Sequence, residues 1–226
     1  MLLVALISYA AVAQKKELKS AQKLVDASLY KKALVALDEM QPLIENAEAK
    51  YISHYYYLYG ISKQKSKDFD GAIAAFDKTN FIEESANLKK YSTLIRLNIP
   101  SLTNDLINEA VDLNSLQEYQ AASKLLNMAY QIDPQNNTDY LYYAASSAVN
   151  AELFEVSLDY YNQLKGLNYT GVVTKYFTTE VDSGNEIEVN ESQYDLYQKM
   201  KDYTNFRKED TESKFPEIVK NIALIH

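Results

Sequence analysis

The chain has 226 residues, 47% of them hydrophobic, which is enough to bury a core in one elongated domain or in two compact ones. Its five Gly and four Pro are few, which disfavours an all-β fold with many tight turns. A net charge of −8, without any basic run longer than two residues, argues against nucleic acid as a partner. Because Cys is absent, disulfides, thiolate zinc sites and an acylated cysteine are excluded.

The N-terminal segment 1–13 is typical of a secretory signal peptide. Its apolar run begins at Leu2, is too short to cross a bilayer as a helix, and ends with Ala11 and Ala13, as in an A-x-A cleavage site. No Lys or Arg precedes the run, so either the true start lies upstream or the signal is degenerate. The alternative is a buried first helix. We expect the segment to direct export to a bacterial periplasm or cell envelope, and no other segment is apolar enough to span a membrane.

A spacing pattern recurs four times within residues 14–170. Each copy has an aromatic residue three positions before a small residue, a large apolar residue four positions after it, and a second small residue twelve positions before it. Offsets of three and four place side chains on one helical face, so each copy predicts a helix-turn-helix whose small residues let the two helices cross closely. The aromatic and small residues are Tyr30 and Ala33, Phe69 and Ala72, Tyr119 and Ala122, and Phe154 and Ser157. The large residues are Leu37, Phe76, Leu126 and Tyr161, and the earlier small residues are Ala21, Gly60, Ala110 and Ala145.

This pattern resembles the tetratricopeptide repeat (TPR) family, whose unit of about 34 residues has small, aromatic and apolar residues at fixed offsets. The most family-like piece is Ala-Tyr-Gln-Ile-Asp-Pro at 129–134. The resemblance implies an all-α fold, a TPR-like α-solenoid of stacked helix-turn-helix repeats. The four units are expected at about 14–47, 53–86, 103–136 and 138–171.

About 16 extra residues separate the second unit from the third. Apolar residues at helical spacing around Leu88 and Ile95 predict an extra helix at about 85–99, or an extension of the preceding helix, that ends at Pro100.

The repeat pattern stops after about Tyr169. Segment 171–191, rich in β-branched residues around a turn-forming Asp-Ser-Gly-Asn, predicts a short β-hairpin near 172–190. Segment 192–214 predicts a polar helix, up to about Tyr203, followed by a charged loop. Segment 215–226 predicts the first helix of a truncated further repeat, with Ala223 in the small position.

The sequence has no constellation that would support catalysis. Its two histidines, His54 and His226, are far apart, and a metal site of ordinary His/Cys type is not expected. Adjacent carboxylates such as Glu83 and Glu84 point about 100° apart on a helix, which favours a solvated face. We therefore expect no catalytic residue, no metal site, no cofactor and no enzyme activity.

The resemblance implies that first helices line a concave groove that binds a protein or peptide. Its positions lie three before, one after and four after the early small residue, and His54 is expected to face the groove as well. The sequence has no Lys–Asn pair there to clamp a C-terminal carboxylate, which disfavours a chaperone-binding role. The alternative is that the tyrosines only cover the groove floor. The positions are Leu18, Gln22 and Val25; Tyr57, Ile61 and Gln64; Ile107, Val111 and Asn114; and Tyr142, Ser146 and Val149.

The expected function is that of a non-enzymatic TPR scaffold or adaptor that mediates protein–protein interaction in the bacterial cell envelope. One alternative is a glycan- or nutrient-binding envelope protein, since tyrosine-rich concave surfaces suit sugar rings. Another is the adaptor part of a longer chain with a catalytic domain after residue 226. The sequence does not determine the oligomeric state.

Overall fold

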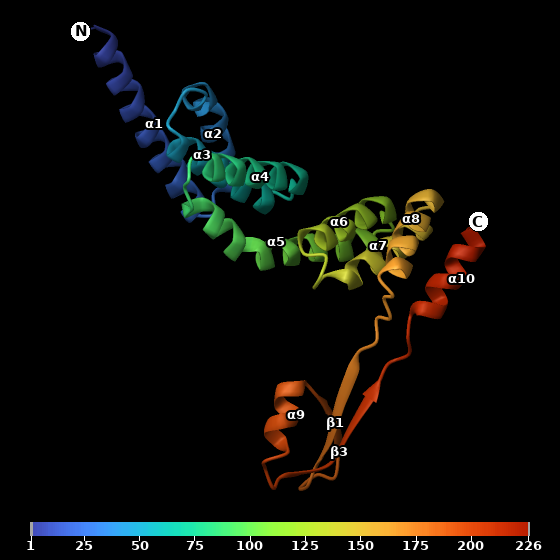
Figure 1. Ribbon diagram of the computed structural model, residues 1–226. Helices are drawn as coiled ribbons and strands as arrows, with labels where there is room; N and C mark the ends of the chain where they lie inside the picture. The colour runs from blue at the N-terminus through green and yellow to red at the C-terminus, as the bar shows by residue number, and fades with distance from the viewer. Residues whose placement is uncertain (1, 226) are drawn as a thin grey trace. The chain divides into compact units, whose positions relative to one another are not determined.

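The computed structural model describes the backbone of residues 2–225 and the side chains of residues 14–225. Within this range the chain forms ten helices and a small three-stranded sheet (Figure 1). It divides into two compact units, one up to Gln117 and one from Glu118 onward. The signal-like segment 1–13 and His226 lie outside the residues whose side chains are described.

Unit 1 consists of five helices: α1 (Leu2–Asp26), α2 (Tyr30–Ile44), α3 (Ala49–Lys65), α4 (Phe69–Ser85) and α5 (Lys90–Ser115). Each helix contacts the next one along the chain. In addition, α1 contacts α3, and α3 contacts α5. Contacts of both kinds are the pattern of a helical repeat array, in which each unit buries its apolar face only against its neighbours. The mostly helical, repeat-like architecture thus fits the expected α-solenoid.

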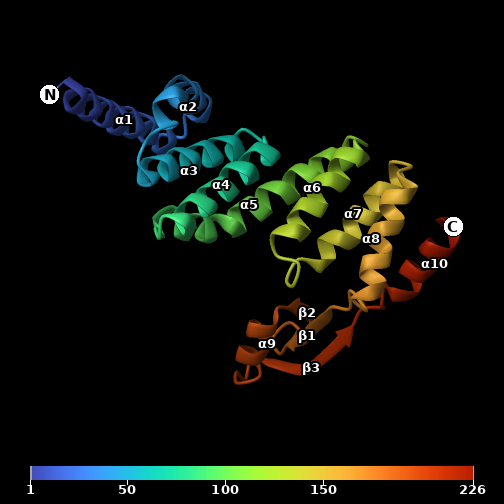
Figure 2. The same ribbon diagram turned by 45° about the horizontal axis from the view of Figure 1, so that its top comes forward.

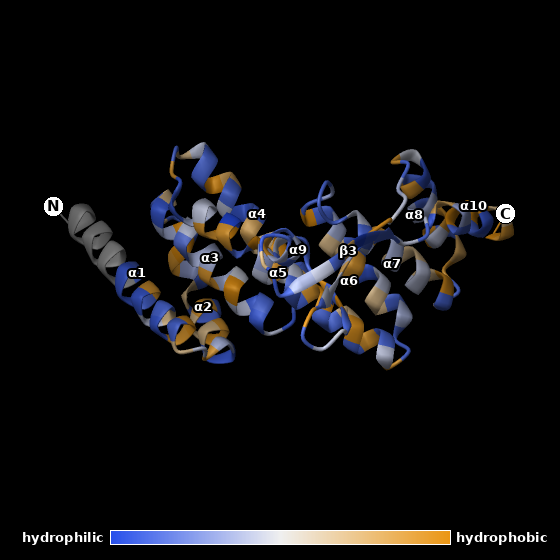
Figure 3. Cartoon of the chain, turned by 90° about the horizontal axis from the view of Figure 1, so that it is seen from below, coloured by the Kyte–Doolittle hydropathy of each residue, from blue (hydrophilic) through white to orange (hydrophobic). Residues whose placement is uncertain are grey.

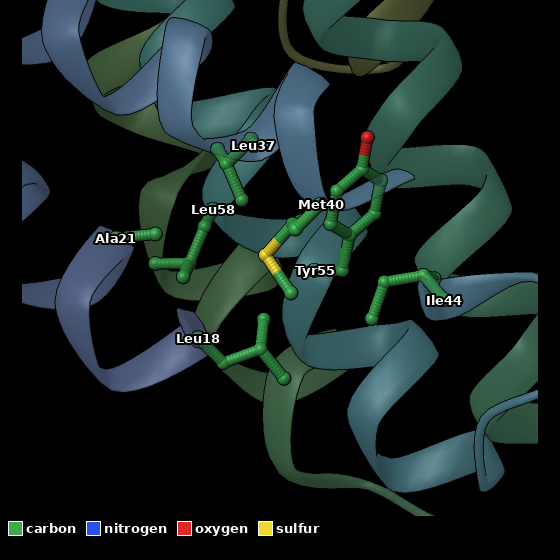
Figure 4. Close-up of a cluster of buried hydrophobic side chains, with 7 residues drawn as sticks. All are labelled: Leu18, Ala21, Leu37, Met40, Ile44, Tyr55 and Leu58. Carbon is green, nitrogen blue, oxygen red and sulfur yellow. The ribbon is translucent and has the colours of Figure 1, made fainter. Parts of the chain in front are cut away.

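The first part of the core of unit 1 joins three helices. Leu18 and Ala21 of α1 meet Leu37 of α2 and Leu58 of α3, and all four side chains are at most 2% exposed (Figure 4). The buried residues of this cluster recur every three or four positions along each helix, as Leu37, Met40 and Ile44 do on α2, which places them on one face. Along the helices, hydrophobic residues accordingly recur between hydrophilic ones (Figure 3).

The small residues of the repeat pattern are all buried, and the aromatic of each copy opens a helix. Tyr30, Phe69, Tyr119 and Phe154 are the first residues of α2, α4, α6 and α8. Except for Gly60, which is also buried, every small residue is 0% exposed. The predicted packing of two helices is therefore confirmed for the pairs α1–α2, α3–α4 and α7–α8, each of which lies within one unit. The fully buried small residues are Ala21, Ala33, Ala72, Ala110, Ala122, Ala145 and Ser157.

The turn within each helix pair has a recurring left-handed residue that the sequence did not reveal. This residue lies two positions before the opening aromatic, and its φ angle is between 58° and 65°. Its amide donates to a carbonyl in the last turn of the preceding helix, which satisfies one of the orphan acceptors there. Because none of the four is glycine, no composition signal marked this turn. The four residues are Ser28, Lys67, Gln117 and Glu152.

The prediction of an extra helix at 85–99 that ends at Pro100 is wrong. After α4 ends, the chain forms one continuous 26-residue helix, α5, with Pro100 inside it. Tyr91 and Ile95, before the proline, are buried on the same helix as Leu102 and Leu106 after it. Tertiary packing on both sides thus outweighs the loss of one backbone hydrogen bond at the proline. The extra residues lengthen the helix that follows them, not the one that precedes them.

Unit 2 has four helices of the array: α6 (Tyr119–Ile132), α7 (Thr138–Asn150), α8 (Phe154–Gly166) and α10 (Phe215–Ile225). Neighbouring helices contact each other, and α10 packs against α8. The core cluster combines Leu141, Tyr142 and Ala145 of α7, Tyr161 and Leu164 of α8, and Ile218 of α10.

The prediction that Ala223 occupies the small, buried position of α10 is wrong. Ala223 is exposed, whereas Ile218, one and a half turns earlier, is 0% exposed and anchors α10 in the core cluster. In the described part of the chain, no helix is long and apolar enough to cross a membrane.

A small β-module lies between α8 and α10. Its strands are β1 (Thr174–Glu180), β2 (Glu186–Val189) and β3 (Tyr203–Asp210), antiparallel in the order β2-β1-β3, with the short helix α9 (Glu191–Tyr197) beside the sheet (Figure 2). The predicted β-hairpin of β1 and β2 is confirmed, and the predicted polar helix is shorter than expected.

The prediction of a charged loop near residue 207 is wrong, because residues 203–210 form the edge strand β3. Asn205 has a φ of 52°, next to a register shift in the pairing with β1, as in a β-bulge. A bulge interrupts the two-residue alternation that marks a strand. The charged Arg207 is accommodated in β3 because it forms an ion pair with Glu186 of β2 at 2.9 Å.

Candidate functional site

The predicted groove residues of α3 lie against α5. The His54 ring stacks on Tyr91 with centroids 4.7 Å apart and planes at 9°, and the Tyr57 ring stacks on the same Tyr91 at 5.2 Å and 30°. Tyr91 itself is only 6% exposed. The N-terminal part of α5, whose packing on α3 the sequence did not predict, therefore covers both side chains that were expected to face a ligand.

Gln64 is also part of the packing between α3 and α5. It is 1% exposed, accepts a hydrogen bond from Asn98 at 2.6 Å and donates one to Asp105 at 2.7 Å. Both partners lie on α5. A buried amide with its donor and acceptor both satisfied stabilises the contact of the two helices.

The remaining predicted groove residues of unit 1 differ in exposure. Leu18 is buried in the core, whereas Val111 is 55% exposed and available to a partner. The others are half-buried: Gln22, Val25, Ile61, Ile107 and Asn114.

In unit 2 the predicted groove residue Tyr142 contacts α10. It is 9% exposed, its hydroxyl donates to Glu217 at 2.9 Å, and the Lys214 ammonium lies 4.4 Å from its ring centroid. Burial first, and then the carboxylate of Glu217, raise the pKa of the Tyr142 hydroxyl. Ser146 and Val149 are half-buried, and Val149 packs on the core cluster of this unit. Tyr142 thus holds α10 against α7.

A cavity of about 320 Å³ lies beside His54, at the end of α3 where the chain passes from α4 to α5. Its wall is mainly apolar, with the rings of Tyr51, His54 and Tyr91 and the side chain of Leu88. A volume near 300 Å³ is at the lower end of ordinary small-ligand sites, so the cavity suits one or two side chains of a partner.

Glu83 lines this cavity and caps α5. Its carboxylate accepts hydrogen bonds from the amides of Tyr91 and Ser92 at 3.0 and 2.9 Å, and from the Ser92 hydroxyl at 2.8 Å. Burial alone would raise the pKa of Glu83, but the hydrogen bonds from these groups outweigh it and lower the pKa. The glutamate is therefore ionised, and its charge interacts with the positive end of the α5 dipole.

The His54 side chain, which lines the cavity, is uncharged. Burial, and then the positive charge of Lys90, lower the pKa of the imidazole to about 4. Its Nε2 lies 2.9 Å from Oε1 of Gln22, so the Nε2–H donates and α1 is connected to α3.

Three lysines contribute positive charge to the cavity wall: Lys50, Lys89 and Lys90. Lys90 donates to the Tyr91 hydroxyl at 3.1 Å, and its ammonium lies 4.7 Å from the Tyr91 ring centroid. Lys50 pairs with Glu48 at 2.7 Å, and more than half of each of these two side chains is exposed. Pairs this exposed are weak, so Lys50 can exchange Glu48 for another anion.

The second cavity, of about 180 Å³, lies between α3 and α5 and is lined by charged pairs. Lys65 contacts Asp105 at 2.6 Å, and Lys67 pairs with Glu109. These pairs satisfy one another, so the cavity is part of the helix contact. Among the residues with described side chains, no group of His, Cys, Asp and Glu is arranged to hold a metal ion.

No protein-family model and no curated protein matches the sequence. The cavity beside His54 is therefore interpreted from its own chemistry. Sequence reasoning found only His54 of its wall. Glu83 was assigned to a solvated face, and Lys89, Lys90 and Tyr91 fell in the predicted extra helix at 85–99, for which no site was expected. No local signal marks Glu83, because it lies inside α4, several residues before α5 begins.

Proposed function

We propose that the chain is a non-enzymatic helical-repeat scaffold of the TPR type that binds a protein or peptide in the bacterial cell envelope. The observation that carries this proposal is the repeat itself. Four helices open on an aromatic residue after a left-handed turn residue, and the pairs α1–α2, α3–α4 and α7–α8 pack together with buried small residues. Arrays of this kind present extended surfaces to partners.

Two surfaces of unit 1 support binding. One is the exposed Val111 on α5, a predicted groove position. The other is the cavity beside His54, with its apolar wall and its lysines. Tyr57 and Tyr142, the anchors expected from the sequence, serve helix packing in this proposal, because each lies against another helix of its own unit.

Site-specific photo-crosslinking tests the scaffold role. A photoreactive phenylalanine analogue is placed at Tyr51, at Val111 and, as a matched control, at Val35, which is 59% exposed on α2. In envelope extracts of the source bacterium, we expect a discrete crosslinked protein from position 51 or 111 and none from position 35. Equal labelling at all three positions, or none at any, would contradict partner binding at these surfaces.

The proposed export has a separate test. The chain is expressed with residues 1–13 intact, and the N-terminus of the product in the periplasmic fraction is determined by mass spectrometry. We expect cleavage after Ala13, because the A-x-A pattern ends there. Retention of the full-length product in the cytoplasm would rule out the signal peptide.

A further inference from the structure

The cavity beside His54 has a charge opposite to that of the chain. The chain has a net charge of −8, whereas the cavity wall has three lysines and one glutamate. That glutamate, Glu83, is 1% exposed and makes its hydrogen bonds to the N-terminus of α5. What a ligand meets in the cavity is therefore the positive charge of Lys89 and Lys90, and that of Lys50 where it exchanges its exposed partner Glu48.

The lysines retain unused hydrogen-bonding capacity. Each ammonium has three donors, and the Tyr91 hydroxyl takes one of those of Lys90. Lys89 and Lys90 are exposed neighbours at the start of α5. A carboxylate offers two oxygens, and charge-assisted hydrogen bonds from ammonium groups to such oxygens are about twice as strong as neutral ones.

The rest of the cavity wall favours an apolar group on the ligand. Tyr51, Leu88 and Tyr91 provide ring and aliphatic surface, and the neutral His54 adds a ring without a charge. A fully hydrated anion such as free phosphate leaves this surface unused. A carboxylate that is carried next to an aliphatic or aromatic group uses both parts of the wall.

We infer that the cavity beside His54 binds a carboxylate side chain of an acidic peptide, together with the apolar residue next to it. The occupant follows from charge complementarity and from a cavity volume of about 320 Å³, which holds one or two side chains. This inference rests on the proposed function, and it names the class of segment that the scaffold recognises.

The test measures binding of capped six-residue peptides, in which glutamate alternates with leucine or phenylalanine, by isothermal titration calorimetry. The matched peptides have glutamine in place of glutamate. We expect the glutamine peptides to bind about tenfold more weakly or worse, because they lose the charge-assisted hydrogen bonds. Affinity for the glutamate peptides should also fall as salt rises from 0.05 to about 0.5 M. Equal binding of both peptide sets would overturn the inference.

A double variant, Lys89→Ala with Lys90→Ala, should lose most of the preference for glutamate. The control is Lys31→Ala with Lys32→Ala, a second exposed lysine pair, on α2, which removes the same charge elsewhere. Equal loss in both variants would mean general charge attraction and would contradict a site. Circular dichroism melts of both variants show whether the helices remain intact, and Lys89→Gln with Lys90→Gln replaces the alanine pair if they do not.

Free phenylacetate distinguishes the source of the carboxylate. If phenylacetate binds and the glutamate peptides do not, the cavity takes a small molecule and the peptide assignment is wrong. The scaffold proposal is tested apart from this one. Crosslinking at Val111 that persists in the Lys89 and Lys90 variant, together with peptides that fail to bind, would leave the scaffold standing and remove only this cavity.

Discussion

His54 of α3 lies flat on Tyr91 of α5, with ring centroids 4.7 Å apart and ring planes at 9°. The stack joins α3, a helix of the second repeat copy, to the N-terminal part of α5, which contains the extra residues between the second and third copies. Both rings also line the cavity to which Glu83 contributes. The packing of α5 on α3 and the candidate binding site therefore depend on the same residues.

The neutral state of His54 predicts a loss of stability on mild acidification. Its folded pKa of about 4 lies below the ordinary 6.5, so the unfolded state binds more protons between these values. Stability from this group is present above pH 6.5 and is lost as the pH falls toward 4. Urea unfolding at pH 7.0 and 5.5 should show a lower midpoint at pH 5.5, and His54→Phe, which keeps the ring, should show a smaller change. An identical change in both proteins would contradict the assignment.

Removal of the Glu83 carboxylate should destabilise the start of α5. Glu83→Ala leaves the buried amide of Tyr91 and the half-buried amide of Ser92 without their acceptor, and we expect a loss of about 1–3 kcal/mol in the free energy of unfolding. Glu84→Ala changes an exposed neighbour on the same helix and should cost no more than about 0.5 kcal/mol. Chemical denaturation of both variants checks the difference. Similar losses at the two positions would show that Glu83 does not cap α5.

Two glycines give opposite predictions for the same change. A Cβ on Gly60 would lie 2.5 Å from the ring of Phe76, which is 3% exposed, so Gly60→Ala should cost about 1–3 kcal/mol. Apart from its chain neighbours and the backbone of its own helix, nothing lies within 4 Å of a Cβ on Gly166, at the end of α8, so Gly166→Ala should stabilise by about 0.5 kcal/mol. Thermal melts of the two variants distinguish the signs. A neutral Gly60→Ala would mean that α3 and α4 can separate without loss.

Tyr142 should affect the attachment of α10. Tyr142→Phe removes the hydrogen bond to Glu217 and keeps the ring in its core cluster, so we expect a loss of about 1 kcal/mol. The substitution should increase the rate of amide hydrogen exchange in α10 more than in α6. Tyr143→Phe makes the same change at a side chain that is 45% exposed and serves as the control. Unchanged exchange in α10 would refute this role of Tyr142.

The helix pairs were predictable because their signal is local. An aromatic, a small residue and a large apolar residue at offsets of three and four lie on one helical face whatever the rest of the chain does. The start of α4 at Phe69 and the burial of Ala72 follow from this pattern alone. The strand β3 was not predictable in the same way, since its bulge at Asn205 breaks the alternation and most of its residues are exposed.

The candidate site was predictable only in part. Position in the repeat singled out His54 and Tyr57 on α3, but it did not reveal what covers them. Tyr91 and Lys90 come from a segment outside the repeat period, and their distance from His54 depends on where α5 begins. Glu83 looked like one of two solvated carboxylates until the start of α5 was placed beside it.

The sequence by itself determined the helices that open on an aromatic residue, the burial of their small residues and the β-hairpin, because each depends on side chains a few positions apart. Only the tertiary structure decided that α5 continues through Pro100, that Tyr91 stacks on His54, and that α10 is anchored by Ile218. These features depend on the burial of surfaces contributed by distant segments. The free energy gained by that burial is larger than the local conformational and solvation preferences of single residues such as a proline, a glutamate or an alanine.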